Sequence, residues 1–311
     1  YPLIIISHGY PGNRFLMSHL GENLASKGYV VASIDHTDST YDDQQVFQST
    51  LYNRPLDQRF VLSALANLAS DPNSFLKGLL DANMTGVVGY SMGGYGLVNN
   101  LGGGFSNEVI GSIMAPPNEL LAQHSTANPD YRNNLDPRIK AGFVIAPWGM
   151  NFGFWRSQDL AGVEVPAFFL AGDADTVADY ENGVRAIYEN VVNSDRYLLT
   201  YKNASHNAGA PYPLPVEILN SEDKTGAEHY TDPVWDTVRM NNIMHHFATA
   251  YFDHYLKQVE GRLSYLDLIP DGADGVYSVR NGRETDGHTY WKGFGSGTAI
   301  GLKLEHLQLG Q

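Results

Sequence analysis

Short apolar runs alternate with helix-length segments along most of this 311-residue chain, and this alternation limits the folds open to it. The runs span residues 3–7, 29–34, 85–89, 141–146, 165–171 and 197–201. Most are nearly continuous in apolar side chains, as expected of strands buried on both faces. Helices are predicted at residues 15–26, 55–70, 74–81, 92–99, 180–191 and 234–258. This order predicts an α/β fold with a mostly parallel central sheet flanked by helices.

Two stretches fit this alternation poorly. Residues 101–138 and 208–233 are rich in Gly, Asn or Pro, and both are much longer than ordinary connections. We expect both to be excursions from a single domain spanning residues 1–311, and to form a lid or the walls of a pocket. The sheet core is expected to end with the helix at 234–258. Residues 299–304, in a tail rich in Gly and Asp, form a candidate further strand.

The composition excludes several classes of partner. Twenty Lys and Arg against 34 Asp and Glu give a net charge of −14, which repels nucleic acid and anionic lipid. No apolar run approaches the roughly 18 residues of a membrane span. The absence of cysteine excludes thiol nucleophiles, Cys-ligated zinc and disulfides. Oligomeric state stays open, as does the choice between a periplasmic or secreted and a cytoplasmic location. Because residue 1 is not Met, we expect a chain processed or trimmed at its front.

The sharpest local signal is the segment 89–94, Gly-Tyr-Ser-Met-Gly-Gly, between a predicted strand and a predicted helix. A nucleophile elbow needs small residues two positions before and two after its Ser, because the strained turn crowds the backbone and lifts the hydroxyl into the open. Gly89 and Gly93 meet that need. The segment therefore predicts Ser91 as a nucleophile, the alternative being a Gly-rich turn with a bystander Ser.

A Ser hydroxyl needs a base to remove its proton and an acid to hold that base, in the chain order Ser, acid, His. Among the eleven His, His206 directly follows the predicted strand 197–201, where its loop would face Ser91. Asp175 follows the strand 165–171 and is the favoured acid. Asp173, the competing carboxylate, is expected to order the turn through backbone N–H groups.

The same chemistry requires two backbone N–H groups that bind the oxyanion. Met92, the residue after the nucleophile, is predicted to supply one, and Tyr10 in the loop 7–13 the other. His8 in that loop is expected to order it by hydrogen bonding. Trp148, after the strand 141–146, would offer an aromatic wall for a substrate, or else pack at the strand end.

With these motifs placed, the chain resembles the α/β-hydrolase superfamily over roughly residues 1–258, most of all dienelactone-hydrolase-like bacterial enzymes and platelet-activating-factor acetylhydrolases. The resemblance rests on Ser7-His8-Gly9, Gly89-Tyr90-Ser91-Met92-Gly93-Gly94, Gly172-Asp173-Ala174-Asp175 and Ser205-His206, in family order. True dienelactone hydrolases have Cys where this chain has Ser91, so the resemblance implies ordinary carboxylic ester hydrolysis. The family usually has one or two strands before residues 3–7; their absence implies an exposed sheet edge, or an edge completed by the tail or another subunit.

The chain is also similar to cutinases and polyester hydrolases. These enzymes share a Ser-Met pair at the elbow, an aromatic residue in the oxyanion loop and a Trp after the next strand, which Met92, Tyr10 and Trp148 match. The long excursions depart from that pattern and would narrow an open cleft.

We therefore expect a serine carboxylesterase that acts on small to medium esters through an acyl-enzyme, with Ser91, His206 and Asp175 as triad. No cofactor or metal is implied, and the partner is a small-molecule ester. The alternatives are a lipase, acetylhydrolase or polyester hydrolase with the same triad, and a catalytically silent binding protein of this fold.

Overall fold

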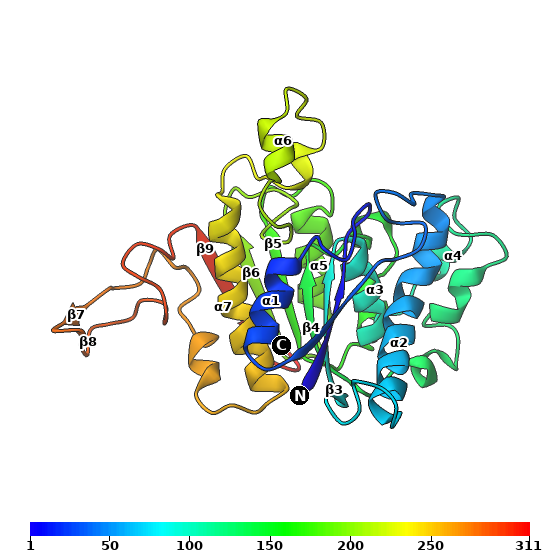
Figure 1. The fold of residues 1–311 in the computed structure, drawn as a ribbon, viewed down its shortest axis with the longest axis horizontal. Helices are drawn as coiled ribbons and strands as arrows, with labels where there is room; N and C mark the ends of the chain where they lie inside the picture. Colours follow the sequence, from blue (N-terminus) through cyan, green and yellow to red (C-terminus); the bar gives the residue numbers. More distant parts are fainter.

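The computed structural model describes residues 1–311 and contains a seven-stranded sheet with helices on both faces (Figure 1). Its strands are β1 (Pro2–Ser7), β2 (Val30–Ile34), β3 (Asp81–Tyr90), β4 (Ile139–Ile145), β5 (Ala167–Gly172), β6 (Arg196–Tyr201) and β9 (Leu302–Leu307). They are arranged in the order β2-β1-β3-β4-β5-β6-β9. All neighbours are parallel except β6 and β9. The predicted mostly parallel α/β architecture is thus confirmed.

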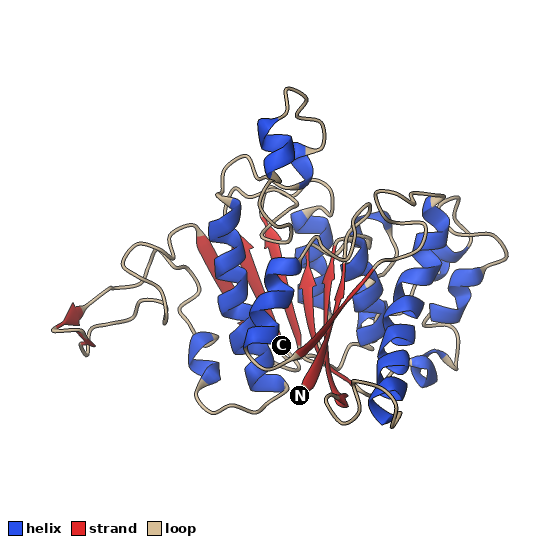
Figure 2. Cartoon of the chain, in the orientation of Figure 1, coloured by secondary structure: helices blue, strands red, loops and turns tan.

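The helices cover this sheet in two layers (Figure 2). They are α1 (Ser18–Ser26), α2 (Phe47–Ser70), α3 (Met92–Leu101), α4 (Asn107–Ile110), α5 (Ala186–Asn190), α6 (Val216–Asn220) and α7 (Thr237–Tyr255). Alternate residues of β1 enter two cores: Ile4 and Ile6 pack with α1 and α7, and Leu3 and Ile5 with α2, α3 and α5. The nearly continuous apolar runs follow from this double burial. None of the helices has the length and hydropathy needed to cross a bilayer.

The predicted helix at 74–81 is wrong, because this segment forms turns and Asp81 opens β3. The Asp81 N–H donates to the carbonyl of Tyr1 at 2.8 Å, and Ser74 Oγ accepts from the N–H of Leu76 at 3.1 Å. Pairing with the residues that lead into β1 therefore outweighs a weak local helical preference.

Helix α2 begins at Phe47, eight residues before the predicted start at Pro55. Proline has no N–H to donate to the carbonyl four residues earlier, which belongs to Leu51. The hydroxyl of Tyr95 on α3 donates to that carbonyl instead, at 2.9 Å. A tertiary contact thus carries the helix through a residue that normally starts or ends one.

The sheet does not end with α7, contrary to the expectation from sequence. The tail returns as β9 and pairs with β6 from Tyr201↔Leu302 to Arg196↔Leu307, so the predicted strand lies about three residues further on. This strand extends the edge formed by β6, while β2 is the last strand at the opposite edge. A two-stranded hairpin, β7 (Val279–Arg280) and β8 (Arg283–Glu284), lies in an arm to the left of the sheet in Figure 1.

Candidate active site

Ser91 stands in a strained turn between β3 and α3. Its backbone has φ 51° and ψ −111°, a conformation that L-residues rarely adopt. A Cβ on Gly89 would lie 2.3 Å from the carbonyl oxygen of Gly93, and one on Gly93 would lie 2.0 Å from that of Ser7. Any side chain at either position would force the turn open, so the elbow depends on both glycines.

Two neighbouring loops lie beside Ser91, because β5 and β6 are parallel and leave the sheet at the same edge. The N–H of Ala174 donates to the carbonyl of Ala204 at 2.9 Å, which joins the loops. A Cβ on Gly172 would lie 2.2 Å from the Ala204 carbonyl oxygen, so glycine permits this close approach. Parallel strand order thereby brings together two segments some thirty residues apart in sequence.

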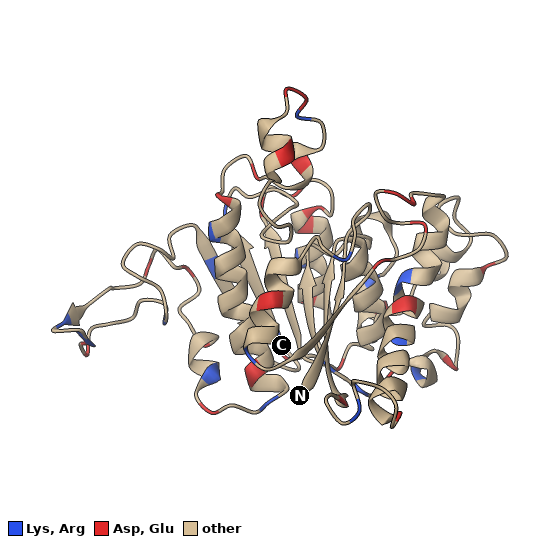
Figure 3. Ribbon diagram, viewed as in Figure 1, with Lys and Arg blue, Asp and Glu red and all other residues tan.

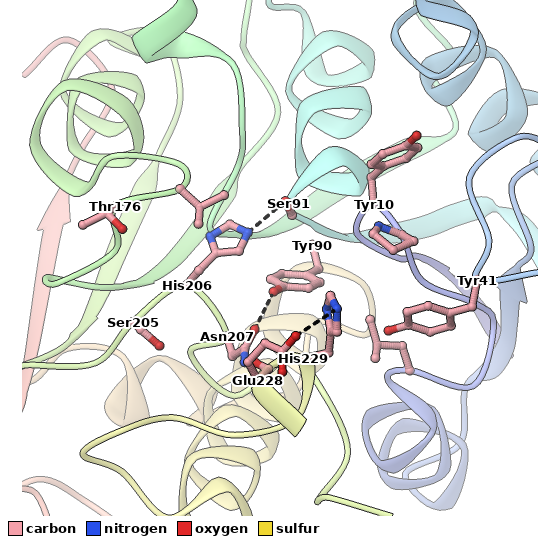
Figure 4. Close-up of a pocket in the computed structure, with 13 residues that line it drawn as sticks. Tyr10, Tyr41, Tyr90, Ser91, Thr176, Ser205, His206, Asn207, Glu228 and His229 are labelled. Carbon is pink, nitrogen blue, oxygen red and sulfur yellow. Dashed lines mark hydrogen bonds and ion pairs between the residues drawn. The ribbon is translucent and has the colours of Figure 1, made fainter. Parts of the chain in front are cut away.

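Three side chains from these loops and the elbow form one hydrogen-bonded row, of which Figure 4 shows His206 and Ser91. His206 Nε2 lies 2.9 Å from Ser91 Oγ, and His206 Nδ1 lies 2.8 Å from Asp175 Oδ2. The Asp175 side chain is fully buried, and Ser91 is 6% exposed. Such a row can pass a proton from the hydroxyl to the imidazole while the carboxylate stabilises the imidazolium.

The two carboxylates that compete in sequence have different surroundings. Asp175 Oδ1 accepts hydrogen bonds from the N–H groups of Val177 and Ala178 at 2.8 and 3.0 Å, which leaves Oδ2 for His206. Asp173 is exposed and accepts from the N–H of Asn203. The structure thus places Asp175, and not Asp173, beside the imidazole.

Of the two predicted oxyanion donors, Tyr10 lies in the loop after β1 and Met92 directly follows Ser91. Met92 is the first residue of α3, and the first N–H groups of a helix have no intrahelical acceptor. The Tyr10 N–H has no hydrogen-bond acceptor within the protein. His8 is buried and makes a 2.6 Å hydrogen bond from Nδ1 to the carbonyl of Gly9. Burial lowers the pKa of His8 to about 2, so the imidazole stays neutral and supports the loop.

A cavity of about 340 Å³ opens beside Ser91. The loops after β1, β2 and β5 form part of its wall, and Glu228 and His229 of the 208–233 segment form another part (Figure 4). No residue of 101–138 lines it. The two excursions therefore differ in their relation to the site.

Asn207, next to His206, joins the 208–233 segment to the site. Its Nδ2 donates to the carbonyls of Glu228 and Thr231, both at 2.7 Å, and its Oδ1 accepts from the Tyr90 hydroxyl at 3.0 Å. Burial raises the pKa of Tyr90, which keeps that hydroxyl protonated as a donor. Sequence reasoning missed this role, and the only available signal was the position of Asn207 directly after the candidate base.

The structure does not bring Trp148 into the lining of this cavity. Its ring stacks on Phe152 at 4.6 Å between centroids and meets Phe47 edge-on at 5.4 Å. Phe47 in turn contacts Tyr10, at 5.2 Å. An aromatic row thus leads outward from the cavity wall, with Trp148 in its middle.

Charges around the cavity are few and acidic. Glu228 lines it, and no Lys or Arg does. The 208–233 segment adds further negative charge at the top of the molecule (Figure 3). Its acidic residues are Glu217, Glu222, Asp223, Glu228 and Asp232, against one basic residue, Lys224. No group of three or more His, Asp or Glu side chains is gathered so that it could hold a metal ion.

Comparison with known proteins agrees with this fold. A family model described as PET hydrolase-like matches residues 1–106. Cutinase est1 of Thermobifida alba is 29% identical over 209 residues, 67% of this chain and 54% of that protein. Cutinase cut1 of Thermobifida fusca is 27% identical over 233 residues, 75% of this chain and 57% of that protein. A bis(hydroxyethyl) terephthalate hydrolase of Streptomyces coelicolor is 26% identical over 204 residues, 65% and 49% of the two chains.

The mostly parallel sheet and its flanking helices are consistent with an α/β-hydrolase fold. In sequence, the chain is similar to cutinases and PET hydrolase-like proteins. The aligned part spans about half the length of these curated relatives.

Proposed function

We propose that this protein is a serine carboxylesterase that hydrolyses small to medium carboxylic esters through an acyl-enzyme intermediate. The observation that supports this most is the row from Ser91 Oγ to His206 Nε2, at 2.9 Å, and from His206 Nδ1 to Asp175, at 2.8 Å. A hydroxyl, an imidazole and a buried carboxylate in this order form the arrangement that activates serine as a nucleophile.

In the proposed reaction, Ser91 Oγ attacks the ester carbonyl while His206 takes its proton. The N–H groups of Met92 and Tyr10 bind the oxyanion of the tetrahedral intermediate. His206 then protonates the leaving alkoxide, which departs as the alcohol. Water, deprotonated by His206, attacks the acyl-enzyme, and His206 then returns that proton to Ser91 Oγ as the acid is released. Throughout, Asp175 orients the imidazole and stabilises its charged form.

The volume of the cavity supports a substrate of small to medium size. Its volume of about 340 Å³ lies at the low end of the range for small-molecule sites, so an ester of modest length fits. A polyester hydrolase is the second candidate, favoured by the aromatic row of Tyr10, Phe47, Trp148 and Phe152, which would bind a longer aromatic chain outside the cavity.

A panel of esters tests the proposal. Purified protein is assayed on p-nitrophenyl esters of increasing chain length, on a phospholipid and on a polyester film. We expect hydrolysis of the short esters, and loss of roughly a millionfold in kcat in Ser91→Ala. Ser26→Ala, an exposed serine on α1, is the matched control and should retain full activity.

The outcomes of this panel separate the candidates. Polyester cleavage with poor turnover of short esters would favour the second candidate. A folded wild-type protein that cleaves none of the substrates would instead indicate a silent binding protein, and hydrolysis that survives in Ser91→Ala would refute the assigned nucleophile.

A further inference from the structure

A buried arginine on α2 lies directly beneath the loop that carries Tyr10. Arg54 is 1% exposed and lies among other buried residues of α2, including Leu51 and Gln58. Removing a guanidinium from water is costly unless its donors are satisfied. Burial lowers the pKa of Arg54 to about 9, so the group still carries its charge at neutral pH. This charge has no direct part in the proposed triad chemistry.

The hydrogen bonds of Arg54 converge on one short stretch of backbone. Its Nη1 donates to the carbonyl of His8, and its Nη2 donates to the carbonyl of Gly9 at 2.8 Å and to Ser39 Oγ. No carboxylate lies within ion-pair distance of the guanidinium, since the nearby Asp57 bonds to His36 instead. The charge is therefore directed at carbonyl groups of the loop.

The geometry of the peptide bond transmits this anchoring to Tyr10. In a trans peptide the carbonyl of one residue and the N–H of the next point in opposite directions. The Gly9 carbonyl is held from one side by Arg54 Nη2 and by His8 Nδ1. The Tyr10 N–H must then point away from both. It has no acceptor within the protein, and Tyr10 lines the cavity beside Ser91.

The distance to the nucleophile is short on this side of the loop. A Cβ built on Gly9 would lie 3.4 Å from Ser91 Cβ. A small rotation of the Gly9–Tyr10 peptide would therefore move its N–H relative to the oxyanion. A charged donor on the carbonyl also polarises the peptide and makes the N–H a stronger donor.

We propose that Arg54 is a positioning residue that aims and strengthens the Tyr10 N–H of the oxyanion site, an inference that rests on the proposed esterase function. Arg54 itself touches neither substrate nor oxyanion. It acts through the Gly9 carbonyl, so its effect should fall on the transition state and spare substrate binding.

The test compares Arg54→Met and Arg54→Lys with Arg196→Met. Arg196 is a matched control because it too is fully buried and donates to backbone carbonyls, at the β6 end remote from His206. Each variant is assayed for kcat and KM on a short p-nitrophenyl ester and for the Ki of a trifluoromethyl ketone, which forms a tetrahedral oxyanion on serine. Circular dichroism and Tm report folding.

We expect kcat to fall about a hundredfold in Arg54→Met, with KM changed less than threefold, because removing an oxyanion donor outright costs 10²–10³. The Ki of the ketone should rise by about the same factor as kcat/KM falls. Arg54→Lys, which keeps the charge but reaches fewer carbonyls, should recover part of the loss. Arg196→Met should lower Tm without this split between kcat and KM.

The proposal is overturned if a folded Arg54→Met or Arg54→Lys retains wild-type kcat and ketone Ki, or if its effects match those of Arg196→Met. Should Arg54→Met fail to fold, the ketone Ki of Arg54→Lys decides. A wild-type protein that neither cleaves esters nor binds the ketone would refute the proposed function, and this inference with it. An active wild type with indifferent Arg54 variants would refute the inference alone.

Discussion

The two long excursions, 101–138 and 208–233, look alike in sequence but occupy different environments. In the first, Phe105, Val109 and Leu121 are buried in the core shared with α2 and α3. In the second, α6 projects beyond the sheet with Val216 61% exposed, while Glu228 lines the cavity. The difference teaches that the first segment holds the fold together, whereas the second is placed to shape what reaches Ser91.

The largest expected effect is on stability, from Phe105→Ala in the first segment. Phe105 is fully buried, and its ring lies 5.4 Å from Tyr95 and 5.8 Å from Phe154. The free energy of unfolding should fall by about 3–5 kcal/mol, measured by guanidinium titration. Val216→Ala on exposed α6 should change it by less than about 0.5 kcal/mol. Equal losses in the two variants would break the comparison.

His124, also in the 101–138 segment, should make the stability of the fold sensitive to acid. Burial lowers the pKa of His124 from 6.5 to about 4. As pH falls from 7 to 5, the unfolded chain binds a proton at this position and the native protein does not, so stability is lost toward acid. In His124→Leu the drop in the free energy of unfolding over this range should be about 2 kcal/mol smaller. Identical pH slopes in the two proteins would contradict this.

Much of this fold could be predicted from sequence, because most inner strands of the sheet are buried on both faces and are therefore nearly continuous in apolar residues. The apolar runs gave six strands within a few residues, and the elbow glycines marked the turn at Ser91. The strand β9 was harder to place, since it returns after a long arm and pairs antiparallel, a choice made by tertiary packing.

Other features depend on contacts between distant residues. The position of the 101–138 segment depends on which core its apolar side chains enter, and this cannot be predicted from its composition. Trp148 follows its strand as expected, but it packs against Phe47 and Phe152 and does not line the cavity. Arg54 is an ordinary surface residue type whose burial appears only once α2 lies under the loop of residues 8–10.

A smaller effect should follow from Asn207→Ala, which releases the second segment from the site. Two hydrogen bonds to the carbonyls of Glu228 and Thr231 and one from the Tyr90 hydroxyl are lost, worth about 1 kcal/mol each. KM should rise several-fold with little change in kcat, and hydrogen exchange in residues 226–231 should speed up. Asn190→Ala, which loses one local bond on α5, is the control. Unchanged KM and hydrogen exchange would show that the hydrogen bonds of Asn207 do not hold the 208–233 segment in place.

The smallest effect is expected from Glu228→Gln. Its carboxylate is mostly exposed, so its charge is screened by water and salt. For a matched pair of cationic and anionic esters, the ratio of kcat/KM values should shift about twofold toward the anionic one, and the shift should vanish in high salt. Glu222→Gln, on the same segment but outside the cavity lining, should leave the ratio unchanged. A salt-independent shift, or equal shifts in both variants, would argue against a charged cavity wall.

The central claim is that His206 and Asp175 activate Ser91, and covalent labelling by a fluorophosphonate followed by mass spectrometry of the intact and digested protein tests it most directly. We expect one adduct per chain, located on Ser91; it should be absent in Ser91→Ala, and its formation should be strongly slowed in His206→Ala. Labelling that persists in Ser91→Ala, or a folded wild-type protein that does not react, would contradict it.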